Sequence, residues 1–222
     1  MKDELIHVYF MPGMAANPSI FEHIELSEEM FKTHYLKWII PKKEESLQAY
    51  AKRMTEKIVH KNPVLVGVSF GGIMVQEMAK IISVRKLIII SSVKSNKELP
   101  KRMIFAKYTK AHKLLPTQIV NNIELLTKYA FGEKAVKRVH LYEKYLSVRN
   151  KYYLDWAIDN IINWEQEVPV ANTIHIHGEK DRVFSLSHIK DCIVVKGGTH
   201  VMIINKFKWF NENLPSLITE KS

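Results

Sequence analysis

The chain has very little cysteine and no long apolar run. Its one cysteine among 222 residues, Cys192, excludes an intramolecular disulfide, and its place beside an apolar stretch indicates a buried structural thiol. No stretch approaches the roughly 20 apolar residues that a membrane-spanning helix requires. The segment Met1 to Leu5 also lacks the apolar core of a secretory signal. We therefore expect a soluble cytoplasmic protein with no integral membrane segment.

Motifs for cofactors, metals and nucleic acids are equally scarce. The chain has only 8 glycines, and no phosphate-binding glycine loop of a common pattern is present. His175 and His177 alternate on a predicted strand and face the same side, but no third ligand stands at a suitable spacing, which favours ordinary sheet histidines. The lysines between 101 and 113 lack the interleaved aromatics of a single-strand platform. We expect no cofactor, no metal and no nucleic acid.

What the chain does have is a regular alternation of strand-like and helix-like segments. This pattern predicts an α/β fold with a mainly parallel central sheet and helices on both faces. Strands are expected at 5–10, 34–40, 63–68, 86–91, 172–177 and 192–196. Helices are expected around 18–30, 45–60, 71–82 and 201–213. The fully apolar strands near residues 65 and 88 suit the sheet centre, where both faces are buried.

A pentapeptide of the form Gly-x-Ser-x-Gly spans residues 67–71, between a predicted strand and a predicted helix. So sharp a turn strains its central residue and brings the strand and helix backbones together, and glycines two before and two after Ser69 remove the Cβ atoms that would collide. The turn lifts the Ser69 hydroxyl off the sheet, beside the N–H groups that open the helix. Ser69 is therefore predicted to be a nucleophile. The alternative is a glycine-rich turn that only packs a helix on a sheet.

A serine nucleophile needs a base to take its proton, and the base needs an orienting partner. Asp181 follows the predicted strand 172–177 in a turn, and His200 follows the next strand after a short loop. Both side chains are thus placed just past strand ends. Glu179 is the alternative acid, and Asp191 is a weaker one because it begins a strand.

Serine, aspartate and histidine in this chain order, each just past a strand, resemble the α/β-hydrolase superfamily. The likeness covers most of the chain. It implies the fold of that superfamily, with Ser69 as nucleophile and His200 as general base and then acid. It further implies that the Asp181 carboxylate fixes the tautomer of the His200 imidazole.

The resemblance also implies an oxyanion hole made of two backbone N–H groups. One belongs to the residue after the nucleophile, Phe70. The other belongs to the loop after the first strand, where we expect Met14 to donate and Gly13 to contact substrate. The superfamily commonly has His-Gly in this loop and the chain has Pro12-Gly13, which leaves Ala15 as an alternative donor.

Between residues 93 and 168 the alternation stops, and helical periodicity continues without a convincing strand. The superfamily carries helical lids at this point, so we expect residues 1–92 and 169–222 to form the hydrolase core and 93–168 to form a helical cap. The cap residues expected to contact substrate are Tyr142, Tyr145 and Trp156. The alternative is that these aromatics only pack the cap against the core.

Charge is concentrated in the same region. The chain carries a net charge of +10, and residues 94–165 hold 14 Lys or Arg against 7 Asp or Glu. A basic cap favours anionic substrates, such as acyl thioesters of nucleotide carriers, or anionic membrane surfaces. The alternative is a simple solvated face.

These patterns together predict a serine hydrolase that cleaves a small-molecule carboxylic ester or thioester through an acyl-enzyme. Hydrolysis of a C–C or amide bond by the same three residues is the nearest alternative. A noncatalytic ligand-binding or partner-binding protein of the same fold is the other, because one fold carries many functions. The patterns predict no particular oligomeric state.

Overall fold

The computed structural model describes residues 5–110 and 143–220. Its centre is a six-stranded sheet in the order β2-β1-β3-β4-β5-β6, and each pair of neighbouring strands is parallel. The strands are β1 (Ile6–Met11), β2 (Phe31–Tyr35), β3 (Val64–Val68), β4 (Lys86–Ile90), β5 (Thr173–Gly178) and β6 (Ile193–Val195). The predicted parallel sheet is confirmed.

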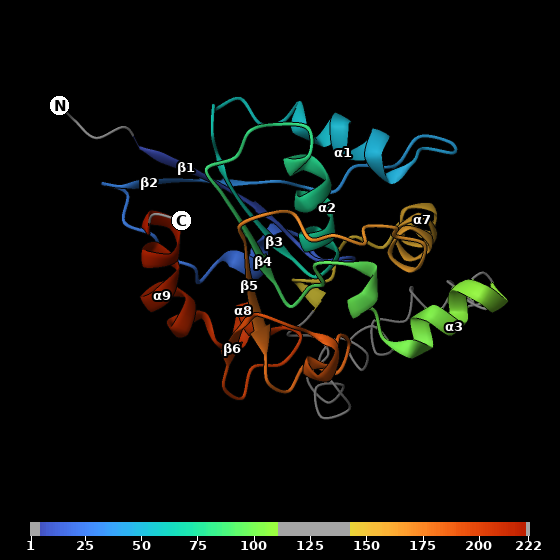
Figure 1. Cartoon of the computed structure of the whole chain (residues 1–222). Coiled ribbons are helices and arrows are strands. Elements are labelled where there is room, and N and C mark those ends of the chain that lie inside the picture. The colour runs from blue at the N-terminus through green and yellow to red at the C-terminus, as the bar shows by residue number, and fades with distance from the viewer. Residues whose placement is uncertain (1–4, 111–142, 221–222) are drawn as a thin grey trace.

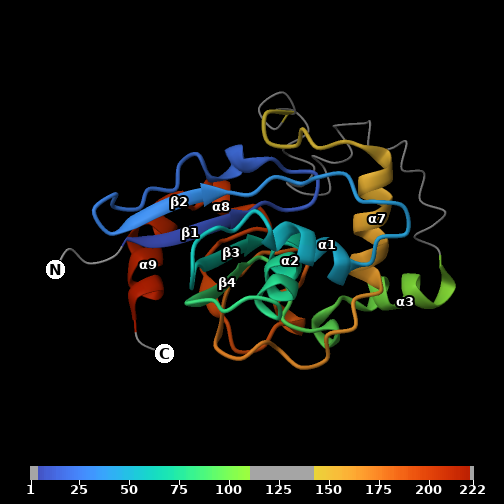
Figure 2. The ribbon, with the colours of Figure 1, turned by 90° about the horizontal axis from the view of Figure 1, so that it is seen from above.

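Helices cover both faces of this sheet. The α-helices are α1 (Leu47–Thr55), α2 (Phe70–Ala79), α3 (Lys101–Thr109), α7 (Lys151–Ile162), α8 (Met202–Asn205) and α9 (Phe207–Thr219), and the 3-10 helices are η1 (Pro18–Phe21), η2 (Asn96–Glu98) and η5 (Leu186–His188). Figure 1 shows α1 and α2 on one side of the sheet and α8 and α9 on the other. Figure 2 shows α3 and α7 side by side, beyond the carboxyl ends of the strands. Among these described helices, none combines the length and the apolar character that crossing a membrane requires.

The two central strands are the most deeply buried part of the sheet. Every residue of β3 and β4 is buried. Because helices cover both faces at the centre of a parallel sheet, an inner strand gains from apolar residues on both sides, and alternation with polar residues disappears. The strand sequences VLVGV and KLIII follow this rule.

The helix predicted over residues 18–30 is wrong, because only its first turn forms. The 3-10 helix η1 ends at Phe21, and apolar residues keep helical spacing only as far as Ile24. Residues 27–30 are all exposed. Beyond Leu26, which packs partly buried against the core, a longer helix would have no apolar face to bury, so the chain turns into β2 instead.

The strand predicted at 34–40 lies earlier, at 31–35. Leu36 and Trp38 alternate inward and are buried, which produces a strand-like pattern. However, β2 pairs with β1, and the Leu36 N–H still donates to the Phe10 carbonyl at 2.9 Å, but β1 ends at Met11, so the chain after Leu36 runs past the end of that strand. The Trp38 indole N–H donates instead to the carbonyl of Gly13, at 2.9 Å.

The remaining predicted helices form, with different ends. The helix expected around 45–60 is the shorter α1. The helix expected at 201–213 is two helices, because the backbone leaves helical geometry at Lys206, with φ of −120°. The second of these, α9, continues to Thr219 because Phe210, Leu214 and Ile218 bury one continuous stripe.

Three backbone segments meet at the turn between β3 and α2. A Cβ atom built at Gly67 would lie 2.6 Å from Val75 Cγ2 and 2.5 Å from the carbonyl carbon of Gly71. A Cβ atom at Gly71 would lie 2.5 Å from the carbonyl oxygen of Met11, at the end of β1. Real Cβ contacts do not reach these distances, so both positions require glycine.

The close backbone contact at the turn between β3 and α2 predicts a loss of stability for Gly67→Ala. The added methyl overpacks a rigid backbone contact, and we expect the free energy of unfolding to fall by about 1–3 kcal/mol in urea titration. Gly13→Ala is the matched control, because its Cβ would lie 3.4 Å from Ser69 Cβ, in ordinary contact. Equal stability losses in the two variants would contradict the steric explanation.

Candidate active site

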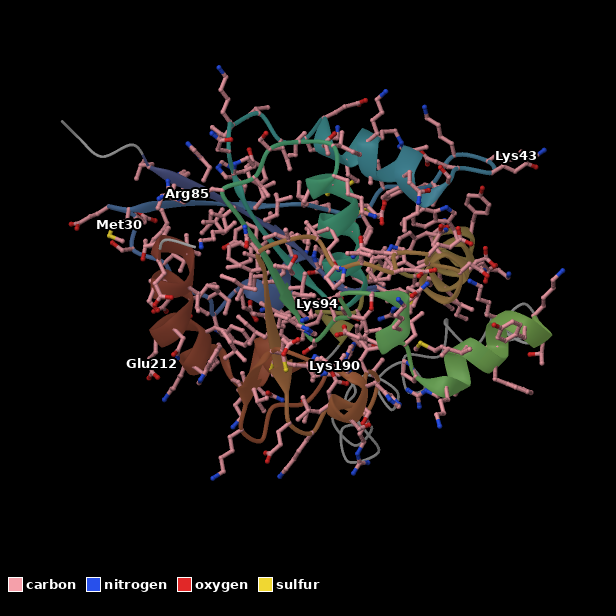
Figure 3. The ribbon with its side chains drawn as sticks, in the orientation of Figure 1. Met30, Lys43, Arg85, Lys94, Lys190 and Glu212 are labelled. Carbon is pink, nitrogen blue, oxygen red and sulfur yellow. The ribbon has the colours of Figure 1, made fainter. Side chains whose placement is uncertain are left out.

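Four loops at one edge of the sheet carry the predicted site residues. These are Gly13 after β1, Ser69 after β3, Asp181 after β5 and His200 after β6. The carboxyl ends of parallel strands share one edge, so residues distant in sequence meet there. In Figure 3, Met30 and Arg85, which directly precede β2 and β4, mark the opposite edge.

Ser69 has the strained backbone expected at the centre of the turn. Its φ of 54° and ψ of −120° lie outside the regions that residues with side chains ordinarily adopt. The turn is held on both sides, because Ser69 N–H donates to the Ile90 carbonyl at 2.9 Å and the Ser92 hydroxyl donates to the Ser69 carbonyl at 2.7 Å. The Ser69 side chain does not cap α2, which leaves its hydroxyl for another partner.

The structure brings Ser69, His200 and Asp181 into one hydrogen-bonded chain. His200 Nε2 lies 2.9 Å from Ser69 Oγ, and His200 Nδ1 lies 2.9 Å from Asp181 Oδ2. Because a carboxylate only accepts, Nδ1 carries the proton and donates it to Asp181. The neutral imidazole then has its lone pair on Nε2, facing the Ser69 hydroxyl. In this tautomer the ring is able to take the hydroxyl proton.

Asp181 is a buried anion. The residue is only 5% exposed, and burial by itself raises the pKa of its carboxyl. The electrostatic interaction and hydrogen bond with His200, with smaller contributions from His177 and the Phe184 N–H, outweigh burial and bring the pKa of Asp181 below its ordinary value. Oδ1 accepts from the N–H groups of Val183, at 2.8 Å, and Phe184, at 3.0 Å. The turn thus holds one oxygen while the other orients His200.

The two alternative acids, Glu179 and Asp191, have different surroundings. Glu179 is exposed, and its Oε2 accepts from the Gly197 N–H at 2.7 Å. Asp191 occupies a left-handed turn before β6, with φ of 45°. Among the three carboxylates weighed from the sequence, Asp181 is the one whose contact with His200 appears in the described part of the chain.

Two buried histidines stand behind Asp181. His177 Nε2 donates to the Phe184 carbonyl at 2.8 Å and lies 3.5 Å from Asp181 Oδ2. His177 Nδ1 therefore accepts from His175 Nε2, 3.1 Å away. Burial lowers the pKa of both rings, that of His175 to about 3, so both are neutral at pH 7. The sequence indicated their shared face, but not their place behind Asp181.

The buried pair predicts a specific acid sensitivity. The folded-state pKa of His175, about 3, lies below the unfolded value of 6.5. The unfolded chain therefore binds more protons in this window, and the contribution of His175 to stability is lost as the pH falls from 6.5 toward 3, by at most about 1.4 kcal/mol per pH unit. In urea titrations His175→Gln should lose stability less steeply over this range than wild type. His188→Gln, in the η5 turn, should keep the wild-type slope; a slope unchanged in His175→Gln would contradict the prediction.

The loop after β1 lies against Ser69, and the orientation of its Gly13–Met14 peptide sets the direction of the Met14 N–H. Gly13 borders Ser69, and the Gly13 carbonyl accepts from the Trp38 indole N–H at 2.9 Å and from the Ala16 N–H at 3.1 Å. The carbonyl and N–H of a trans peptide point in opposite directions. The Met14 N–H, on the same peptide, therefore points away from those two groups.

Phe70 carries the other predicted donor. It is the first residue of α2, where N–H groups have no carbonyl partner within the helix. Its side chain is fully buried and stacks on Trp38, with ring centroids 5.0 Å apart and 11° between the planes. The position of the Phe70 N–H is thus fixed by the core. Ala15, the alternative to Met14, adopts a left-handed φ of 64°.

The aromatic residues predicted to contact substrate have different surroundings. Tyr142 lies outside the described residues. Tyr145 is half-buried, and its hydroxyl donates to Glu22 Oε1 at 2.7 Å. Trp156 is buried, its indole N–H donates to a backbone carbonyl in the turn before α1, and its ring meets that of Phe70 edge-on at 6.0 Å. Trp156 therefore packs on the residue that opens α2.

The described parts of segment 93–168 contact three of the site loops. The hydrogen bonds are Asn17 N–H to the Tyr145 carbonyl at 2.9 Å, Val148 N–H to the Ala15 carbonyl at 3.0 Å, and Arg102 Nη2 to the carbonyls of Arg182 at 3.1 Å and Val183 at 3.0 Å. Packing of Trp156 on Phe70 is the third contact. The segment is therefore joined to the Met14 loop, the Asp181 loop and the start of α2.

Comparison with known proteins gives a match at the level of structure. No protein-family model and no curated protein matches the chain. A hydrolase from Pseudomonas aeruginosa PA01 matches with a TM-score of 0.72 and 14% identity, over 98% of this chain and 91% of its own. A bromoperoxidase from Bacillus anthracis has a TM-score of 0.71 and 17% identity, over 98% and 93%. An esterase from Exiguobacterium antarcticum has a TM-score of 0.64 and 18% identity, over 97% and 92%. The chain has the α/β-hydrolase fold, as predicted from its sequence.

Proposed function

We propose that the protein is a serine hydrolase that cleaves a carboxylic ester or a thioester. The observation that carries this proposal is the continuous hydrogen-bonded chain from Ser69 through His200 to Asp181, with the serine in a strained turn at the mouth of a helix. Similarity in fold to a hydrolase and an esterase supports the same class of chemistry.

In the proposed first half-reaction, Ser69 Oγ attacks the substrate carbonyl carbon while His200 Nε2 takes its proton. The imidazolium is stabilised by the ionised Asp181, to which Nδ1 already donates. Collapse of the tetrahedral intermediate breaks the bond to the leaving group, and His200 returns the proton to the departing alkoxide or thiolate. An acyl-enzyme on Ser69 remains.

The negative charge that develops on the carbonyl oxygen needs donors in place before the reaction begins. We assign this role to the N–H groups of Phe70 and Met14. The first opens α2, where the helix dipole also favours an anion, and the second points away from the two groups that hold the Gly13 carbonyl.

The second half-reaction repeats the same proton transfers with water. His200 takes a proton from the water, the hydroxide attacks the acyl carbon, and the proton is returned to Ser69 Oγ as the acid leaves. Asp181 stays ionised throughout, because its buried carboxylate is held by the turn as well as by His200. No group outside this chain is needed for the proton balance.

We assign residues 93–168 as a cap that shapes the substrate pocket. Its described parts contact the Met14 loop, the Asp181 loop and Phe70, and these contacts fix the position of the segment relative to the proposed reacting groups. Trp156 is placed to influence the pocket through Phe70. The basic composition of segment 93–168 favours an anionic substrate.

The same three residues also support hydrolysis of C–C or amide bonds, and related folds host other reactions, as the bromoperoxidase match illustrates. A product analysis with ester, thioester, amide and diketone substrates distinguishes these chemistries. A ligand that raises the melting temperature without being consumed would favour the noncatalytic alternative.

Substitution of the nucleophile tests the proposal directly. Wild-type protein incubated with a fluorophosphonate probe should gain the mass of one adduct, and neither Ser69→Ala nor His200→Ala should. Hydrolysis of p-nitrophenyl acetate should fall by about 10⁴–10⁶-fold in Ser69→Ala. The exposed Ser187→Ala is the control and should label fully. An adduct that persists in Ser69→Ala would contradict the assignment.

The acid is tested by two neighbouring carboxylates. Asp181→Asn should lower kcat by a factor on the order of 10⁴, because the amide supports the wrong imidazole tautomer. Glu179→Gln, two residues away, should hydrolyse p-nitrophenyl acetate at nearly the wild-type rate, since its carboxylate bonds the Gly197 N–H. A large loss in Glu179→Gln with little loss in Asp181→Asn would reverse the assignment.

A further inference from the structure

Three histidines from distant parts of the sequence form a cluster beside β1 and β2. His7 lies on β1, His34 on β2, and His60 in the segment that leads from α1 to β3. One ring nitrogen from each residue lies within 4.8 Å of the other two. All three are partly buried. The histidine cluster is distinct from the candidate active site, whose residues follow the carboxyl ends of the strands.

We propose that the histidine cluster binds one Zn²⁺ ion through three imidazole nitrogens. His7 Nδ1 and His34 Nε2 are already 2.9 Å apart. Two nitrogens bound at about 2.0–2.1 Å in a tetrahedral zinc site are separated by about 3.3 Å, so this pair needs to open by only a few tenths of an ångström. The proton that the two nitrogens share moves to the other nitrogen of its own ring, and both lone pairs then face the ion.

The third ligand is oriented by a hydrogen bond outside the cluster. His60 Nδ1 lies 2.6 Å from the hydroxyl of Tyr9, which also accepts from the Val59 N–H at 3.3 Å. With Nδ1 directed at this oxygen, Nε2 is the nitrogen left to bind a metal. Metal-bound histidines ordinarily donate their second ring N–H in this way, which fixes the tautomer. Tyr9 is 3% exposed, so the orienting group is itself fixed.

The ring arrangement shows what must move on binding. His60 stacks on His7, with centroids 3.4 Å apart and 9° between the planes, so the His60 ring must rotate out of this stack before its Nε2 faces the same ion as His7 Nδ1. The centroid of the His34 ring lies 4.8 Å from that of His60 and 4.4 Å from that of Tyr9. These movements are rotations of side chains. The backbone register of β1 and β2 already supplies the spacing.

The donor set favours zinc over the other common ions. Neutral imidazoles suit Zn²⁺ and related borderline metals, whereas Mg²⁺ and Ca²⁺ require oxygen ligands. Three protein ligands leave the fourth position for water. A bound ion would join β1, the edge strand β2 and the chain entering β3.

Isothermal titration calorimetry with ZnCl₂ on tag-free, chelator-stripped protein tests this proposal. Wild type should bind one ion per chain. His34→Gln, which keeps a polar group near Nε2, and His60→Asn, which keeps one near Nδ1 for Tyr9 but removes Nε2, should each weaken binding by at least about tenfold. Tyr9→Phe should weaken it less. Binding of Co²⁺ should give visible absorption bands in wild type that both histidine variants lack.

Two control variants separate the cluster from other histidines. His23→Gln removes an exposed ring outside the cluster, and His200→Gln removes the ring beside Ser69. Both should bind zinc as wild type does. No zinc binding by well-folded wild type would overturn the proposal, as would binding that persists in His34→Gln and His60→Asn but is lost in His200→Gln. Ser69→Ala should also bind zinc normally, so this test is independent of the hydrolase activity.

Discussion

The close backbone crossing between the end of β1, the end of β3 and the start of α2 is the constraint on which the site depends. No side chain fits at Gly67 or Gly71, so α2 begins in direct contact with the β1 backbone. That contact forces Ser69 into its positive φ and places its hydroxyl outside the helix. It also places the Phe70 N–H beside the loop that carries Met14. One steric condition therefore fixes Ser69 and both proposed donors together.

The second organising group is the Asp181 carboxylate. Burial disfavours the charged form of a carboxyl, so the pKa of an unpaired buried carboxyl rises above its ordinary value. Two turn N–H groups, His200 and the nearby His177 reverse that tendency. The neutral His175–His177 pair fills the space behind the acid without adding charge. The Asp181 carboxylate is thus supported from the turn and from the core.

The sequence predicted most of this arrangement because the site residues belong to local patterns. The Gly-x-Ser-x-Gly turn, the apolar central strands and the positions of Asp181 and His200 after strands are each contained in a few consecutive residues. Their order alone indicates that they meet, because parallel strands share a carboxyl edge. The contacts of Ser69, His200 and Asp181 agree with that inference.

The features that sequence reasoning missed depend on partners far along the chain. The pattern at 34–40 is strand-like, but a strand requires a neighbour, and β1 ends at Met11, so only the first residues of that segment have a partner on it. The apolar residues after Pro18 keep helical spacing only as far as Ile24, so a longer helix would not bury an apolar face. The histidine cluster was missed for the same reason, since its members are far apart in sequence and meet only through the β1–β2 register and the chain after α1.

The attachment of segment 93–168 to the loop after β1 couples two properties that are usually treated separately. Val148 and Tyr145 hydrogen-bond the backbone of Ala15 and Asn17, immediately after the peptide that carries the Met14 N–H. In the proposed reaction, displacement of that segment by a bulky acyl group would pull on the loop whose Met14 N–H is the proposed oxyanion donor. The size of the acyl group would therefore affect the rate of bond cleavage as well as the binding affinity, because a poorly fitting acyl group would misplace the Met14 N–H.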